Sequence, residues 1–206
     1  MAGILPTGVG DGTEQQAAFF WSLRADAHTA WREAGLAPWK ARVARHWPAC
    51  SPYLDQISDA KQLTFARYAH RTVARPFASA LIHLGDAWHS ASPQLGQGAN
   101  MALLDAWALA KAVAETSDLA SAPQIAVKMR KLHVAAYQAL TWLFTPIYQS
   151  DSRVLPLLRD WLMGPLSKLW PLTALQASLV SGLVAEPLRP LGLKLDLALG
   201  EFPRPR

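Results

Sequence analysis

The sequence predicts an α+β protein, with short strands in its first part and helices toward its end. Ala80–Leu84 is an apolar run of strand length, and a loop rich in glycine and proline follows from Gly85 to Gly98. Ala99–Glu115 is rich in Ala and Leu and contains neither Gly nor Pro, which favours a helix. A longer helical region is expected after Pro123, because apolar and helix-forming residues dominate there.

Composition limits the classes of function. The 206 residues carry a net charge of +5, and 51% of them are hydrophobic, so the chain can bury one good core. The Lys and Arg residues are scattered rather than striped, which argues against a nucleic-acid partner. Cys50 is the only cysteine, which excludes an intrachain disulfide and suits a reducing cytoplasm. The first residues lack the basic and apolar regions of a signal peptide.

Short elements are expected up to residue 75. Gly3–Pro6 is an extended piece, residues 8–12 are a turn cluster, and Ala17–Leu23 reads as a buried strand. A simple hairpin explains this first segment nearly as well. Ser51 is the candidate N-cap of a short helix. Lys61–Thr72 alternates as a strand does, and the alternative is an exposed strand with a polar face.

Residues 25–47 favour two short helices, broken at Gly35 and Pro38. Their apolar side is expected to hold Trp31, Trp39, Val43 and Trp47. The basic residues of this segment predict a solvated face, with a phosphate or NADPH contact as the alternative. They are Arg32, Lys40, Arg42 and Arg45.

The glycine-rich loop carries the clearest chemical signal. Glycines let backbone N–H groups approach a polar ligand, and a helix N-terminus adds unpaired donors and a partial positive charge. The common dinucleotide fingerprint does not fit, because Gly96-Gln97-Gly98 is followed by Met101 at the sixth position. These glycines also stand well beyond the end of the strand rather than directly after it.

A longer pattern fits instead. It consists of Gly85-Asp86-Ala87-Trp88-His89, then Pro93, then Gly96-Gln97-Gly98-Ala99-Asn100, then Asp105-Ala106. This pattern resembles the second FAD-binding motif of flavin-dependent aromatic hydroxylases, the monooxygenases related to para-hydroxybenzoate hydroxylase and to the ubiquinone-pathway hydroxylases. Trp88 departs from the family, which usually carries a small residue there. Its ring would either crowd the ribityl chain or fill space beside it.

The resemblance implies an FAD-dependent, NAD(P)H-using monooxygenase that hydroxylates a small aromatic, polyketide or isoprenoid-like substrate through a flavin C4a-hydroperoxide. Asp86 would accept hydrogen bonds from the ribityl hydroxyls, and Pro93 would lie close to the isoalloxazine ring. The pyrimidine edge of the flavin would face backbone groups at the start of the predicted helix. The cofactor-binding residues implied in this way are Gly85, Asp86, Pro93, Gly96, Gln97, Gly98, Ala99 and Asn100. The resemblance names no catalytic base.

Simpler roles stay open for several of these residues. Asp86 could serve only as a cap of a turn or helix. His83, Asp86 and His89 could be read as a metal site, although three-residue spacings across a strand and a loop define no convergent geometry. Asp105 is either a buried acid bonded to the glycine loop or a satisfied structural residue.

The C-terminal region is expected to be helical. A long helix should run from Gln124 to Phe144, with Pro123 in its first turn and an end or kink at Pro146. Its first half is basic, at Lys128, Arg130 and Lys131. Helices over Arg153–Met163 and Leu166–Val184 should follow, and prolines at 187, 190, 203 and 205 predict an extended end.

The apolar stretches of this region carry polar groups and fall short of a spanning helix. Three uses of the apolar surface stay open. It could be a cap packed on its own domain, a surface for a second copy of the chain, or a surface resting on the inner face of a membrane.

Together with the resemblance, these patterns predict three domains. Residues 1–75 would be a partial substrate-domain sheet, 76–122 the end of a Rossmann-like FAD-binding domain, and 123–206 a helical cap. The resemblance also puts Tyr68, His70 and Arg71 near the substrate or nicotinamide.

The G-x-G-x-x-G turn that binds the ADP half of FAD in these enzymes has no match in the sequence, and neither has their central Asp-Gly motif. We therefore expect the C-terminal half of a flavin hydroxylase, completed by an N-terminal segment or a partner chain. The alternative is a non-catalytic remnant or interaction module that uses its apolar helical tail.

Overall fold

The computed structural model describes residues 2–10, 12–79, 81–148, 152, 154–170 and 172–194. The chain divides between Arg67 and Tyr68 into two compact units, each described by itself below. Both combine helices with small antiparallel strand pairs, as the predicted α+β class requires. The Rossmann-like assignment and the domain boundaries at residues 75 and 122 stay predictions.

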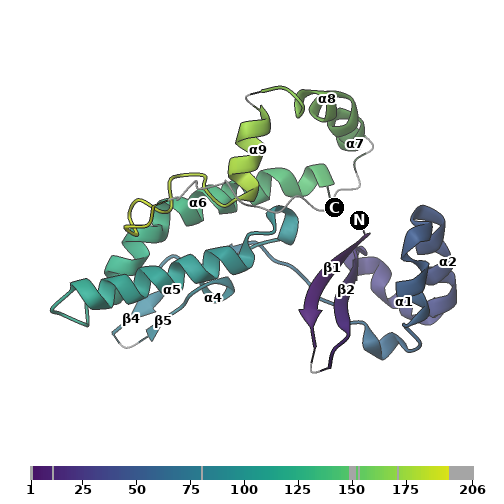
Figure 1. Cartoon of the computed structure of the whole chain (residues 1–206), viewed down its shortest axis with the longest axis horizontal. Coiled ribbons are helices and arrows are strands. Elements are labelled where there is room, and N and C mark those ends of the chain that lie inside the picture. The colour runs from purple at the N-terminus through teal and green to yellow at the C-terminus, as the bar shows by residue number, and fades with distance from the viewer. Residues whose placement is uncertain are drawn as a thin grey trace. The chain divides into compact units, whose positions relative to one another are not determined.

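The first unit begins with a β-hairpin (Figure 1). Strands β1 (Ala2–Val9) and β2 (Gln15–Trp21) pair antiparallel, with Ala2 opposite Trp21 and a register shift between Pro6 and Gly8. The simple hairpin is thus confirmed, but the expected buried strand is wrong. Most of β2 is exposed, and Phe20 is 46% exposed, because only one face of this hairpin meets helices.

Three short helices complete the core of this unit: α1 (His28–Ala34), α2 (Leu36–His46) and α3 (Ser51–Asp55). Single 3₁₀ turns cover Ala25–Ala27, Pro48–Cys50 and Ala60–Gln62. The buried cluster consists of Trp39, Val43, Cys50 and Leu54, with Trp31 and Trp47 packed against it, so the predicted apolar side is confirmed.

Gly35 separates α1 from α2 at φ +79°, as predicted. The predicted break at Pro38 is wrong, because Pro38 lies in the first turn of α2, where its missing N–H would have no helical partner. The N-cap of α3 is Cys50 rather than Ser51. Arg32, Arg42 and Arg45 are exposed, in agreement with a solvated face.

The predicted strand over Lys61–Thr72 is wrong. Ala60–Gln62 is a 3₁₀ turn that begins with a capping box between Asp59 and Gln62, and residues 64–70 have no regular structure. Only two residues of this segment are paired, as the short strand β3 (Arg71–Thr72). Arg71 forms an isolated antiparallel bridge with Ser90, and Thr72 forms one with His89. An alternating pattern becomes a strand only where a partner strand can pair with it.

The second unit contains the strand, loop and helix that the sequence singles out. The strand is short: β4 (Phe77–Ala78) pairs antiparallel with β5 (Leu81–Ile82). The loop that follows is not irregular throughout, because it contains α4 (Asp86–His89) and a 3₁₀ turn at Pro93–Leu95. Helix α5 (Gly98–Glu115) begins one residue earlier than predicted and ends as predicted.

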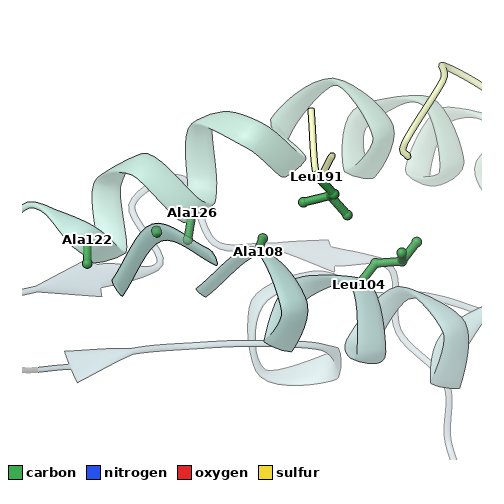
Figure 2. Close-up of a cluster of buried hydrophobic side chains, with 6 residues drawn as sticks. Leu104, Ala108, Ala122, Ala126 and Leu191 are labelled. Carbon is green, nitrogen blue, oxygen red and sulfur yellow. The ribbon is translucent and has the colours of Figure 1, made fainter. Parts of the chain in front are cut away.

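Helices α5 and α6 (Ala122–Tyr148) lie side by side and form the core of this unit (Figures 1 and 2). Small side chains let the two helices approach closely, since Ala108 and Ala112 are fully buried and Ala122 and Ala126 nearly so. Figure 2 shows that Leu191, from the C-terminal segment, points into the same cluster.

Pro123 is the second residue of α6, as predicted, but the predicted end at Pro146 is wrong by two residues, and the alternative of a kink there stays a prediction. The helix continues to Tyr148, because a proline so close to the end removes only one hydrogen bond of the last turn.

The remaining chain is helical in short pieces. It forms α7 (Val154–Leu158), a π-helical turn at Arg159–Met163, α8 (Gly164–Leu166) and α9 (Leu172–Val180). The expected extended end is wrong for residues 187–191, which form turns that bury Leu191, whereas Pro203 and Pro205 lie outside the described residues. Within the described part of the chain, no helix is long and apolar enough to cross a membrane.

Candidate functional site

A cavity of about 250 Å³ is lined by the glycine-rich loop and by one face of α6. Five of the eight residues predicted from the sequence line it: Asp86, Pro93, Gly96, Gln97 and Gly98. The opposite wall consists of Tyr137, Gln138 and Thr141, and Tyr68 also contributes. Residues from four separate parts of the second unit therefore meet around one space.

The other three predicted residues lie beside the cavity rather than on its wall. Gly85 is buried, and its N–H donates to the Asp105 carboxylate at 3.0 Å. Ala99 and Asn100 belong to the first turn of α5, and the Asn100 amide donates to Oε1 of Gln97 at 2.9 Å. These three residues thus shape the loop that lines the cavity.

Asp86 is the one acidic side chain on the cavity wall, in the part of the chain that the structure describes. It is exposed and has no hydrogen bond or ion pair with another described residue. It stands in the first turn of α4, but the N-cap is Gly85 and no side chain caps this helix. A capping role is therefore not observed, and its two oxygens are available to accept hydrogen bonds from a ligand.

The start of α5 lies at the same cavity, where Gly98 forms part of the wall. Gly96 is left-handed, at φ +64°, and this lets the loop turn directly into the helix. The first bond of the helix runs from Met101 N to Gln97 O at 2.9 Å, so the N–H groups of Gly98 to Asn100 have no intrahelical partner. Such an end carries a partial positive charge and favours a ligand that is negative or rich in acceptors.

Asp105 ties this loop to α6. Its carboxylate is 1% exposed and accepts hydrogen bonds from His89 Nε2 at 2.6 Å and from Arg130 Nε at 2.8 Å, besides that from Gly85. Burial alone would raise the pKa of Asp105, but the bonds from His89 and Arg130 outweigh it and hold this pKa below its ordinary value. Asp105 is thus the buried acid bonded to the glycine loop, one of the two roles left open by the sequence.

Arg130 was expected in a basic stretch of α6, yet it is fully buried. Its guanidinium bonds Asp105 and donates to His133 Nδ1 at 2.6 Å. Since arginine only donates, His133 Nδ1 must accept, and its Nε2–H donates to the Gly182 carbonyl at 3.1 Å. Burial, reinforced by the charge of Arg130, lowers the pKa of His133 to about 4, so this histidine is neutral.

This neutral histidine predicts a pH dependence of stability. The pKa of His133 is about 4 in the folded chain against an ordinary 6.5, so between these values only the unfolded chain binds the proton. The free energy of unfolding should therefore fall as the pH decreases from 6.5 to 4, by roughly 1–3 kcal/mol from this residue. The measurement is urea denaturation at several pH values.

The control for this prediction is His133→Gln, which keeps an acceptor and a donor but does not titrate between pH 4 and 6.5. The free energy of unfolding of this variant should depend less steeply on pH, between 4 and 6.5, than that of the native chain. Parallel curves for the two proteins would contradict the assignment of a neutral His133.

A metal site at His83, Asp86 and His89 is not formed. His89 is buried, lines the cavity and is hydrogen-bonded through Nε2 to Asp105. The described residues contain no group of three or more His, Cys, Asp or Glu side chains placed to hold a metal ion. Trp88 is also buried, in a cluster with Met101, Val134 and Tyr137, so it fills core space rather than the cavity.

Sequence reasoning missed the residues that α6 contributes. Arg130, His133, Tyr137 and Thr141 are all buried and recur at intervals of three and four, so they share one helix face. Their spacing is a signal that could have been found, since polar residues at core positions of a helix usually have a specific partner.

The site is thus a cavity with mainly apolar walls, formed by the glycine-rich loop, the start of α5 and one face of α6. Residues 10–125, more than half of the chain, match the protein family described as FAD binding domain, and the chain belongs to this family. No curated protein and no solved structure matches the chain. The family supports FAD as the cofactor and a flavoprotein of the hydroxylase type.

Proposed function

We propose that the cavity holds the flavin half of FAD, in a monooxygenase of the aromatic hydroxylase type that uses NAD(P)H. The observation that carries this proposal is the meeting of Asp86, Pro93 and Gly98 around one cavity at the N-terminus of α5, in a chain of the FAD binding domain family. These residues lie on the predicted flavin motif, and their chemistry is that of a flavin site.

The residues present fit such a ligand. The cavity volume of about 250 Å³ lies just below the range of about 300–1,000 Å³ typical of ligand pockets, which suits a ring system rather than a whole dinucleotide. Pro93, Leu95 and Met101 offer apolar walls for a flat ring, and Asp86 offers an acceptor for hydroxyl groups. The N-terminus of α5 offers donors to the electron-rich edge of the ring.

Bound flavin would supply the redox and oxygen chemistry, and the chain would supply orientation, electrostatics and exclusion of water. Asp86 would hold the polyol, and the start of α5 would stabilise negative charge on the ring. Tyr137 donates its hydroxyl to the Leu179 carbonyl at 2.9 Å, so it would offer the cavity its ring and no proton. The site accounts only for the flavin half. We propose that the ADP half is held elsewhere, by an N-terminal segment or a partner chain, as in the C-terminal half of a hydroxylase.

A second candidate function is an interaction module without catalysis. It is favoured by exposed tryptophans on α6 and in the chain that follows it, where Trp142 is 70% exposed and Trp161 and Trp170 are each 83% exposed. Such rings suit a partner, a second copy of the chain or the surface of a membrane.

The two functions are separated by a turnover assay. The purified chain is supplied with FAD, and oxidation of NADH and NADPH is followed with and without simple phenolic substrates. If the chain is a monooxygenase, oxidation of NADH or NADPH should require FAD and should increase when a substrate is present. Oxidation that is the same with and without the chain, at saturating FAD, would favour the interaction module.

A further inference from the structure

The C-terminal turn, defined here as residues 178–184, lies outside the stretch that matches the family, yet it contacts the flavin motif. The Gln97 amide donates to the Val180 carbonyl, while Gln97 Oε1 accepts from Asn100. Both polar ends of the Gln97 side chain are therefore occupied, one of them by a residue 83 positions further along the chain.

Gly182 is the closest point of this contact. A Cβ atom at this position would lie 2.2 Å from Asn100 Nδ2 and 2.6 Å from Gln97 Oε1, far inside van der Waals contact. Gly182 also has φ +78°, a backbone conformation that L side chains rarely adopt. Only glycine lets the turn lie against the two motif side chains.

The turn has a defined local geometry. Helix α9 ends with a bond from Leu183 N to Ser178 O at 2.9 Å and one from Gly182 N to Leu179 O at 3.3 Å. This is the Schellman arrangement, in which a left-handed glycine follows the helix end. The position of Gly182 is therefore set by the end of α9 and not by the motif that it touches.

Helix α6 holds the turn in place. His133 donates to the Gly182 carbonyl at 3.1 Å, and Tyr137 donates to the Leu179 carbonyl at 2.9 Å. His133 is bonded through Arg130 to Asp105, which accepts from Gly85 and His89 at the start of the motif. Both ends of the glycine-rich motif are thus connected to the same turn.

The turn contacts the motif from outside the cavity. The cavity wall includes Gln97, but among the described residues that line it there is none from 178–184. The turn therefore leaves the space for a ligand open and acts on the positions of Gln97 and Asn100.

We propose that the C-terminal turn is a positioning element of the flavin site, in which Val180 and Gly182 set the side chains of Gln97 and Asn100 and thereby the affinity for flavin. This inference rests on the proposed function. It adds to the site a segment that the family match does not contain, and it makes Gly182 a positioning residue.

The chain provides a matched control in Gly192. Gly192 also belongs to a Schellman arrangement and has φ +68°. Its two bonds run from Leu193 N to Leu188 O at 3.0 Å and from Gly192 N to Arg189 O at 3.1 Å. A Cβ atom there would meet only the flexible end of Lys111, at 3.4 Å. Gly182→Ala and Gly192→Ala therefore introduce the same backbone strain, but only the first displaces motif side chains.

The test titrates riboflavin and FAD into the full chain and the two variants, and records thermal unfolding of each. Both variants should lose thermal stability through backbone strain, and Gly182→Ala should lose more, because its Cβ also overlaps Gln97 and Asn100. Gly182→Ala should weaken flavin binding by about tenfold, the effect of one misplaced hydrogen bond, while Gly192→Ala binds as the native chain does. Equal affinity of Gly182→Ala and Gly192→Ala would overturn the inference.

A second readout needs no flavin. Side-chain amide NMR signals of Gln97 and Asn100 should move in Gly182→Ala and stay in place in Gly192→Ala. Unmoved signals in both variants would overturn the inference even if flavin binds. A native chain that binds no flavin would overturn the proposed function and the affinity claim together, whereas moved amide signals would still support the contact.

Discussion

Asp105→Ala should lower the free energy of unfolding of the second unit by about 3–5 kcal/mol. The substitution leaves the fully buried Arg130 guanidinium without its carboxylate and also removes the acceptor of His89 and of the Gly85 N–H. An uncompensated buried charge is among the most destabilising changes in a protein, because the ion loses both hydration and its partner. The measurement is native-state hydrogen exchange of the α5 and α6 amides, which reports on this unit alone.

Glu115→Ala is the matched control, since it removes an acid from the same helix. Glu115 pairs with Lys111 four residues earlier, but its side chain is 58% exposed, so its loss should cost no more than about 0.5 kcal/mol. Replacing Asp105 and Arg130 together by leucine should recover part of the loss, because no unpaired charge is left in the core. Similar protection losses in Asp105→Ala and Glu115→Ala would contradict the buried network.

Gly85→Ala should destabilise the same unit by about 2–4 kcal/mol, through two separate effects. Gly85 has φ +53°, which strains any L side chain, and an added Cβ would lie 2.9 Å from Cβ of Ala102 on α5. Strain and overlap both act where the motif meets the helix. Chemical denaturation of the variant, followed by circular dichroism, measures the loss.

Gly96→Ala is the comparison without overlap, because Gly96 also has a positive φ, +64°, but has open space around it. Gly96 lies in the αL region, whereas Gly85, at φ +53° and ψ −136°, lies outside it, so backbone strain should also be smaller at Gly96. The free energy of unfolding of Gly96→Ala should fall only through backbone strain, by about 1 kcal/mol. A Gly85→Ala, Ala102→Gly double variant should be less destabilised than the sum of its single changes. Equal losses in Gly85→Ala and Gly96→Ala would show that the close approach to Ala102 has no energetic consequence.

Local patterns predicted the elements that depend on nearby residues. The run of Ala and Leu over residues 99–115 became α5 within one residue, and Gly35 ended α1 because a left-handed turn there suits glycine. Where the structure of a segment depends on more than its own residues, the local pattern gave a wrong prediction. Lys61–Thr72 alternates but finds no strand to pair with over most of its length, and α6 continues two residues past Pro146.

The residues of the candidate site also fall into a group that the sequence predicted and a group that it did not. The motif from Asp86 to Gly98 could be located from the sequence by its resemblance to the flavin motif of aromatic hydroxylases, whose residues lie within one short stretch of chain. The spacing of Tyr137 and Thr141 indicates a shared helix face, but which cavity that face lines depends on how α6 packs on α5. Arg130 was read as part of a charged stretch, because a run of basic residues does not reveal which one faces the core.

Binding of flavin by this chain, through the cavity at Asp86, is tested by a flavin titration. FAD is added to the native chain, to Asp86→Ala and to Asp55→Ala, an exposed acid in the first unit, and the fluorescence of the flavin is followed. We expect the native chain and Asp55→Ala to bind FAD, with affinity weakened by about 10- to 100-fold in Asp86→Ala, as expected for hydrogen bonds to a charged acceptor. Equal binding by all three proteins, or binding by none, would contradict this expectation.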